Sequence, residues 1–206
     1  MSAHKTLRLA ELALLVAKRC NSPGANELRA HAWAELGNAR RILTDLARAA
    51  AAFAQAEQLI ANSCTDPLFP AELLSLRASL AQHQQQFNDA LAMLGQASAI
   101  LARCRADPLL ARVLLQRAAL HARQGRPEAG IVTACQALDL AERVNEPALK
   151  RMAIQNLISL VAEAGHPDRA SAFVARARPL FDTATDRLDR LRFEWVAGRI
   201  DADLGL

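Results

Sequence analysis

The 206-residue chain is 52% hydrophobic and 22% charged, and its 45 alanines and 33 leucines make up more than a third of it. Helices favour Ala, Leu, Arg and Glu, whereas strands favour the β-branched and aromatic residues that are scarce here, so the composition predicts an all-α fold. It excludes a disordered chain. Because the longest uncharged stretch covers only residues 90–102, it also excludes a membrane-spanning helix.

The charge and cysteine patterns narrow the class of protein further. The 25 basic and 21 acidic residues are interspersed, without the concentrated basic stripe typical of nucleic-acid binding, so we expect no nucleic-acid partner. The N-terminus lacks the pattern of a secretion signal, and the four cysteines form neither a CxxC pair nor a cluster with histidines. We therefore predict a cytoplasmic protein with free thiols, no metal site, no cofactor and no membrane contact.

Turn signals divide the chain at nearly constant intervals of 41, 40, 40 and 40 residues. Helix-start signals follow the same period, because an acidic residue before Pro can cap free backbone N–H groups while Pro fits the first helical turn. The turn signals are Thr44-Asp45-Leu46, Gln85-Gln86-Phe87, Gly125-Arg126-Pro127, Gly165-His166-Pro167 and Gly205-Leu206, and the start signals are Asp66-Pro67, Asp107-Pro108 and Glu146-Pro147, with Asp186 as the counterpart before the last helix.

In chain order, these signals predict about ten helices in a single repeat domain. A lone helix comes first, four helix pairs follow, and a lone helix ends the chain. The predicted ranges are 5–21 for the first helix, 26–62, 66–104, 107–144 and 146–182 for the pairs, and 186–206 for the last helix.

The first pair carries the residues of a known repeat. Trp33-x2-Leu36-Gly37-x2-Arg40 is followed by Ala49-x3-Phe53-x2-Ala56. This pattern resembles the tetratricopeptide repeat (TPR), with Arg40 where the family usually has Tyr. The later pairs also place Ala or Gly where two antiparallel helices approach closely. The resemblance implies a right-handed α-solenoid of antiparallel helix pairs, and the 40-residue period resembles the long repeats of bacterial regulatory and signalling proteins.

Half-repeats stand at both ends of the chain. The first helix carries Ala10-x3-Leu14-x2-Ala17, the pattern of a second helix without its first, and the last helix has the pattern of a first helix without its second. We expect a piece of a longer array, and the alternative is that the terminal helices act as caps. In a longer array, Phe193, Val196 and Ile200 would contact a missing helix or a partner.

The sequence contains no recognisable catalytic pattern. GxSxG, HExxH, GxxxxGK[ST] and GxGxxG motifs are all missing. The acid pairs Asp182/Asp186 and Asp186/Asp189 fall in a loop and at a helix start, where capping accounts for them. We therefore predict no enzymatic activity.

The TPR resemblance implies that the first helix of each pair lines a concave groove, where polar residues predominate here. Side-chain amides donate and accept hydrogen bonds together, which suits an extended peptide backbone, and Arg can hold carboxylates. Asn38 and Asn156 resemble groove asparagines that grip peptides in the family, whereas Trp195 is either an exposed anchor or a packing residue for a further repeat. The candidate partner-binding residues are Asn38, Arg41, Ser79, His83, Arg112, Gln116, Arg123, Gln155, Asn156, Arg192, Trp195 and Arg199.

Three functions follow from this interpretation. The first is a protein–protein interaction scaffold that binds a peptide or a partner domain in the concave groove. The alternative is a ligand-sensing regulatory arm of a larger bacterial signalling or transcription-regulator protein. The third is a structural role, with self-association through the exposed terminal half-repeats.

Overall fold

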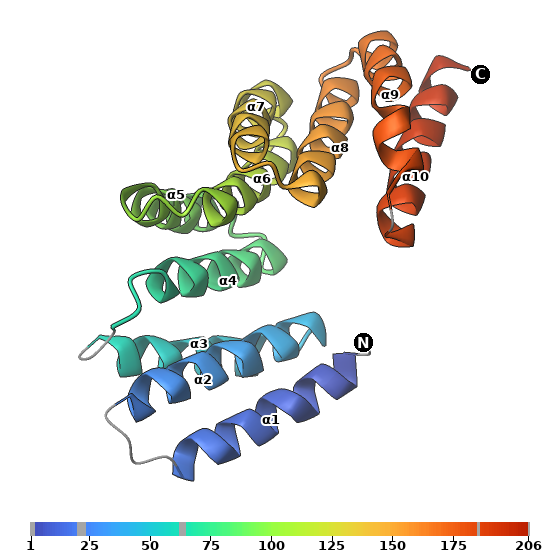
Figure 1. Cartoon of the computed structure of the whole chain (residues 1–206). Helices are drawn as coiled ribbons and strands as arrows, with labels where there is room; N and C mark the ends of the chain where they lie inside the picture. Colours follow the sequence, from blue (N-terminus) through green and yellow to red (C-terminus); the bar gives the residue numbers. More distant parts are fainter. Residues whose placement is uncertain (1–2, 20–23, 62–64, 185, 206) are drawn as a thin grey trace. The chain divides into compact units, whose positions relative to one another are not determined.

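The computed structural model describes residues 3–19, 24–61, 65–184 and 186–205, which form ten α-helices and no strand (Figure 1). No helix in this described part is long and apolar enough to cross a membrane. The helices fall into two compact units, Met1–Cys104 and Arg105–Leu206. The predicted helix ends at residues 21, 62 and 206 lie outside the described residues, as do Cys20 and Cys64, whereas Cys104 and Cys135 are free and exposed.

Within each unit, consecutive helices pack side by side (Figure 1). The first unit contains α1 (Ala3–Arg19), α2 (Ala25–Ile42), α3 (Leu46–Ile60), α4 (Phe69–His83) and α5 (Phe87–Arg103). The second unit contains α6 (Asp107–Arg123), α7 (Pro127–Arg143), α8 (Pro147–Glu163), α9 (Pro167–Asp182) and α10 (Arg187–Leu204).

The repeating turn signals share one backbone conformation. Thr44, Gln85, Gly125, Gly165 and Gly205 all have positive φ, between 62° and 82°. A residue in this left-handed region ends a helix and lets the following amide bond back to a carbonyl that the last turn leaves free. Each signal that recurs along the sequence therefore marks the end of a helix.

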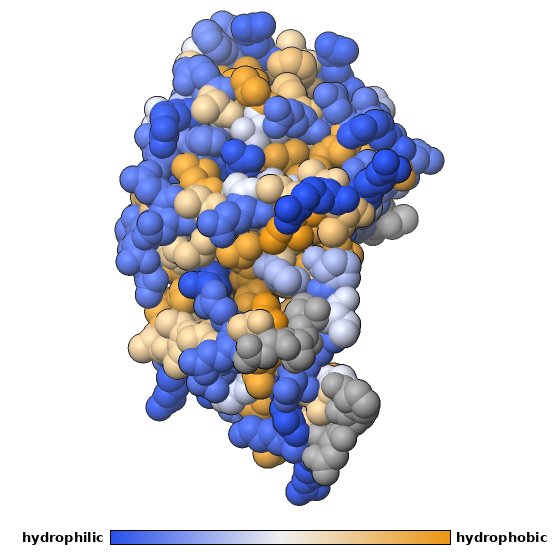
Figure 2. Space-filling model, turned by 90° about the vertical axis from the view of Figure 1, so that its left-hand side faces the viewer, coloured by the Kyte–Doolittle hydropathy of each residue, from blue (hydrophilic) through white to orange (hydrophobic). Residues whose placement is uncertain are grey.

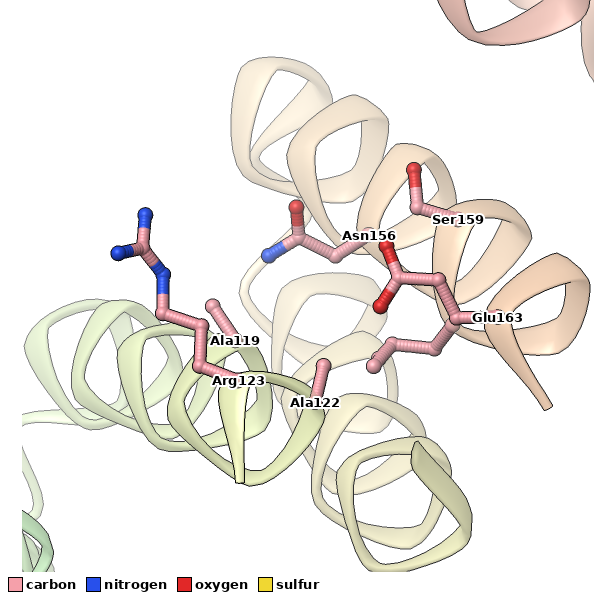
Figure 3. A pocket seen from close by; sticks show the side chains of 7 residues that line it. Ala119, Ala122, Arg123, Asn156, Ser159 and Glu163 are labelled. Carbon is pink, nitrogen blue, oxygen red and sulfur yellow. The ribbon is translucent and has the colours of Figure 1, made fainter. Parts of the chain in front are cut away.

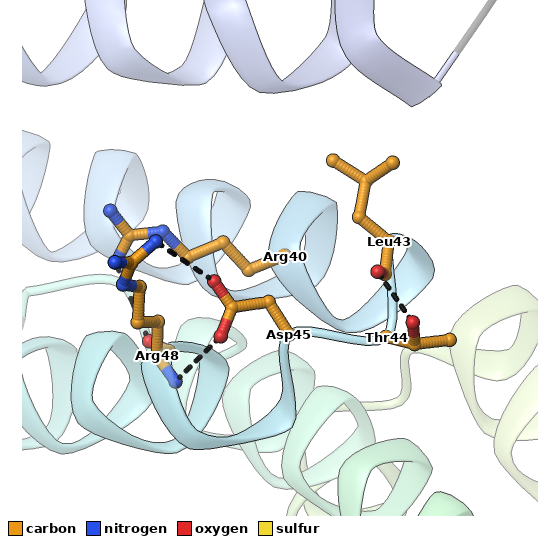
Figure 4. Close-up of polar contacts among 5 residues, drawn as sticks. All are labelled: Arg40, Leu43, Thr44, Asp45 and Arg48. Atoms are coloured by element: carbon orange, nitrogen blue, oxygen red, sulfur yellow. Dashed lines mark hydrogen bonds and ion pairs between the residues drawn. The ribbon is translucent and has the colours of Figure 1, made fainter.

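The turn between α2 and α3 shows how these residues act (Figure 4). The Thr44 hydroxyl donates to the Leu43 carbonyl at 2.6 Å. Asp45 caps α3, because its carboxylate accepts the Arg48 amide at 3.4 Å. Arg40, where the TPR pattern usually has Tyr, donates to the Arg48 carbonyl at 3.5 Å. Arg40 thus ties the end of α2 to the first turn of α3.

The acidic start signals behave in two different ways. Asp66 accepts the Leu68 amide at 2.8 Å just before α4 begins, and Asp186 accepts the Leu188 amide at 2.8 Å at the start of α10. These two carboxylates cap free N–H groups as the sequence predicts.

The same expectation is wrong for Asp107 and Glu146, which form no capping hydrogen bond. Helix α6 begins at Asp107 itself, so this carboxylate lies inside the helix rather than before it, and Glu146 has a longer side chain than the residues that favour cap positions. Instead, the two carboxylates lie 4.0 Å from Arg143 and 3.4 Å from Arg112. The start signals therefore mark helix beginnings, but half of them do so without a side-chain cap.

The recurring small residues are buried where helices meet. Three alanines stand at equivalent positions of their repeats and are fully buried: Ala49, Ala90 and Ala170. In the remaining repeat the equivalent position is Gly130, and Ala134, one helical turn later, is fully buried. Gly37 permits an even closer approach, because a Cβ atom there would lie 2.6 Å from the ring of Phe53. The Ala excess of the composition is therefore concentrated at helix–helix contacts.

The last helix differs from the expectation for an unfinished repeat. The apolar face formed by Phe193, Val196 and Ile200 is already covered, because these residues are buried in a cluster with residues of α8 and α9. The Phe193 ring stacks on Phe181 of α9 with their centroids 4.0 Å apart, which covers this face within the unit. A buried ion pair between Arg151 of α8 and Asp189 of α10, at 3.0 Å, adds a second link.

Other apolar residues of the terminal helices are exposed. On α10 these are Leu188, Leu191 and Trp195, spaced so that they share one face, and on α1 they include Leu9 and Leu12. On the face drawn in Figure 2, hydrophilic residues predominate, with apolar residues among them.

Candidate binding groove of the second unit

A hollow of about 230 Å³ lies between α6 and α8 (Figure 3). Three of its residues lie on one face of α6 and four on the facing side of α8, because residues three and four positions apart share a helix face. The lining residues are Ala119, Ala122 and Arg123 from α6, and Asn156, Ser159, Leu160 and Glu163 from α8.

Two of these residues have unused hydrogen-bonding groups. In the described part of the chain, no hydrogen bond or ion pair joins Arg123 or Asn156 to another residue, although Asn156 is half-buried. Figure 3 shows Asn156 reaching from α8 into the space that Arg123 borders on α6. The hollow therefore offers a cationic donor and an amide that can both donate and accept.

The third polar group of the hollow links it to α10. Glu163 lies 3.7 Å from Nη2 of Arg199, a buried nitrogen that makes no hydrogen bond to a described residue. The Arg199 guanidinium in turn lies 5.3 Å from the centroid of the Trp195 ring, within cation–π range. Trp195 is 66% exposed, so it stands in solvent at the end of this chain of contacts.

The predicted residues of the first unit are brought together, but they bind one another. The Asn38 oxygen accepts two hydrogen bonds from Arg41, at 2.8 and 3.3 Å, and Arg41 also contacts Nε2 of His83 at 3.1 Å. Burial lowers the pKa of Arg41. Ser79 donates to the Ser75 carbonyl at 3.1 Å. A ligand at this place would have to compete with bonds that the chain already makes.

The remaining predicted residues do not line the hollow. Arg112 pairs with Glu146, and Arg192 is exposed, while Gln116 and Gln155 are half-buried on α6 and α8. The candidate partner-binding residues did not include Ser159, Leu160 and Glu163 of α8, nor Ala119 and Ala122 of α6. The spacing of Ala119 and Ala122 could have predicted their place, because residues three and four positions apart share a helix face, here the one that carries Arg123. Small side chains on that face leave space for a ligand.

One trio in the described part of the chain consists of residue types that bind metals. Ligand atoms of Glu27, His31 and Asp66 lie within 4.8 Å of one another. The Glu27 carboxylate, however, accepts hydrogen bonds from the Thr65 hydroxyl at 2.5 Å and from the Asp66 amide at 2.8 Å. These two bonds, the Thr65 bond first, lower the pKa of Glu27. They account for the position of Glu27 as an anchor of the segment before α4.

No family model and no curated protein matches the chain, but solved structures share its fold. BtubC (BKLC) from P. vanneervenii has a TM-score of 0.83 at 18% identity, covering 100% of this chain and 85% of that one. A putative kinesin light chain from Podosopora anserina with nearly identical TPR-like repeats has a TM-score of 0.67 at 16% identity, covering 89% of this chain and 90% of that one.

A Rap protein complexed with Competence and Sporulation Factor is also similar. Its TM-score is 0.74 at 15% identity, and the match covers 98% of this chain but only 60% of that one. Together with the ten helices, these likenesses show that the chain has a TPR-like helical-repeat fold. Identities this low are informative about the fold alone.

Proposed function

We propose that the chain is a protein-interaction scaffold that binds an extended peptide in the hollow between α6 and α8. The observation that carries the proposal is the pair formed by Arg123 and Asn156, which face this hollow without partners in the described part of the chain. Unpaired polar groups that face a half-enclosed surface are available to a ligand, whereas those of the Asn38–Arg41–His83 cluster are already bonded.

The chemistry of the hollow specifies the peptide. The Asn156 amide can donate to a backbone carbonyl and accept from a backbone N–H, which is independent of sequence. Arg123 favours a carboxylate, from an acidic side chain or a C-terminus. The exposed ring of Trp195, held by Arg199, supplies an apolar contact beyond the hollow. We therefore expect a peptide with an acidic group followed by an apolar one.

A displayed random-peptide library, selected on the immobilised chain, tests this proposal. The selected peptides should be enriched in acidic residues, and their affinity is then measured by fluorescence polarisation. Asn156→Ala should weaken binding about tenfold, because one or two hydrogen bonds to the peptide are lost. Arg123→Glu should weaken it further by repelling the carboxylate.

Arg112→Glu is the matched control, because it makes the same charge change on the same helix but outside the hollow. Its binding should stay near that of the unmodified chain. Equal losses in Arg112→Glu and Arg123→Glu would show that net charge, rather than the hollow, governs binding, and the proposal would then be wrong.

A second candidate function is a ligand-sensing regulatory arm of a larger signalling or transcription-regulator protein. It is supported by the likeness to a Rap protein complexed with Competence and Sporulation Factor. The genomic reading frame around the chain tests it: a DNA-binding or kinase domain in the same frame would support this function, and stop codons on both sides would contradict it.

A further inference from the structure

A second cavity, of about 420 Å³, lies in the second unit between α7, α8 and α9. Its volume falls in the range of small-molecule sites, about 300–1,000 Å³. Seven of its nine lining residues are aliphatic or aromatic, and the other two are Lys150 and Arg176; the seven are Leu138 of α7, Ile154, Leu157 and Ile158 of α8, and Phe173, Ala177 and Leu180 of α9. It lies on the other side of α8 from the proposed peptide hollow, so it is a separate site.

The first unit contains a hollow between α3, α4 and α5 that overlaps with this cavity in the repeat register, because its residues Glu57, Arg77 and Met93 stand at the positions of Leu138, Leu157 and Phe173. There Arg77 of α4 reaches Glu57 of α3 at 2.5 Å, and this ion pair spans a hollow of only about 220 Å³. Internal repetition thus allows the same position to be compared twice within one chain.

The repeat register shows what replaces the ion pair in the second unit. Arg77 and Leu157 both lie eight residues before a left-handed turn residue, Gln85 and Gly165 respectively. Glu57 and Leu138 both follow a fully buried alanine, Ala56 and Ala137, of equivalent helices. Two leucines therefore stand where the first unit has an ion pair.

This exchange changes the chemistry of the groove. Leucines cannot bridge the gap by a charge contact, so the groove stays open and apolar. Water in such a cavity finds few hydrogen-bonding partners, which favours its displacement by an aliphatic chain.

The exposed charges at this cavity are both positive. Arg176 has no ion pair or hydrogen bond within the described part of the chain. Lys150 lies 2.9 Å from Glu142, and both side chains are at least 40% exposed, so this pair is weak. Lys150 also borders an adjoining hollow lined by Glu142 and Glu146. Arg176 is therefore the anchor that a carboxylate would meet without competition.

We propose that this cavity binds a small amphipathic carboxylate of the medium-chain fatty-acid class. The aliphatic chain lies against Leu138, Leu157 and Phe173, and the carboxylate is held by Arg176 at the mouth, with Lys150 as a second cation. The apolar walls and the positive mouth together select an anion with an apolar body over a neutral lipid or a fully polar acid.

Isothermal titration of the full chain with decanoate, below its micelle concentration, tests this proposal without any peptide. We expect saturable binding of one decanoate per chain. Leu138→Glu combined with Leu157→Arg should abolish it, because this double variant introduces the ion pair that the first unit already accommodates. Val132→Glu is the control for the added charge, since Val132 is exposed on α7 and does not line the cavity.

Arg176→Gln separates the roles of head group and chain. It should weaken decanoate binding about tenfold while leaving decanol binding unchanged, since decanol lacks the carboxylate. Because Arg176 is exposed, this variant also keeps the test valid if the double variant does not fold.

Three outcomes would overturn the proposal. The first is the absence of saturable decanoate binding, and the second is equal decanoate affinity in the unmodified chain and the folded double variant. The third is a dimer of the unmodified chain that the double variant returns to a monomer, which would assign the groove to a second copy of the chain.

Discussion

The close contact between Gly37 and Phe53 predicts that Gly37→Ala lowers the free energy of unfolding, whereas the same change at another glycine, Gly95→Ala, raises it. A Cβ atom at Gly37 would lie 2.6 and 2.7 Å from two ring carbons of Phe53, whose side chain is only 1% exposed and has little room to move. Gly95 of α5 lies in the interior of a helix of the same unit and has no heavy atom within 4 Å of its ideal Cβ.

The magnitude follows from two opposing effects. Ala is favoured over Gly in a helix interior by about 1 kcal/mol, and this gain applies to both positions. Gly95→Ala should therefore raise the free energy of unfolding by up to about 1 kcal/mol. At Gly37 the same gain is opposed by overpacking, which typically costs about 1–3 kcal/mol. The difference between the two variants, about 1–3 kcal/mol, isolates the steric cost because the helix-propensity gain cancels.

Tryptophan fluorescence during urea unfolding provides the assay, because each unit has one of the two tryptophans. Trp33 is half-buried in the first unit and should shift its emission on unfolding, whereas the exposed Trp195 should change less. Adding Phe53→Leu to Gly37→Ala should recover part of the loss, since the smaller side chain leaves space for the new methyl group. If Gly37→Ala stabilises the first unit as much as Gly95→Ala, the steric reasoning is wrong.

Three further changes test other parts of the structure. Arg151→Ala should destabilise the second unit by about 3–5 kcal/mol in thermal melts, because it leaves buried Asp189 without its partner, while replacing both residues by Leu should cost much less. Thr44→Gly should raise the free energy of unfolding of the first unit by about 1 kcal/mol, and with it the urea midpoint, because a β-branched residue with φ of 62° is strained; a lower midpoint would contradict this. The lowered pKa of Glu27 implies stability that is present above pH 4.5 and lost as the pH falls through the folded-state value. Glu27→Gln should remove that part of the acid sensitivity measured by urea unfolding, and an unchanged pH profile would show that the contact with Thr65 is not maintained in solution.

The fold could be predicted from the sequence because its signals are local. A left-handed residue at 44, 85, 125, 165 and 205 ends a helix wherever it occurs, and a small residue such as Ala49 or Ala90 marks a close helix contact. Both kinds of signal recur with the repeat, so four copies of the same pattern reinforce one another. The sequence therefore determined the number of helices in the described part of the chain and the TPR-like class of the fold.

Only the tertiary structure decided which polar and apolar residues remain available. Asn38 and Asn156 look alike in the sequence. In the structure, Asn38 accepts hydrogen bonds from Arg41, whereas Asn156 has no partner in the described part of the chain. In the sequence, Leu138 and Leu157 look like ordinary core residues. The structure shows that they line a cavity in the second unit, at the repeat positions where the first unit has the Glu57–Arg77 ion pair. Hydrogen bonds and cavities depend on side chains from several helices, which local patterns do not bring together. The sequence thus specified the scaffold, and packing between its helices selected the sites.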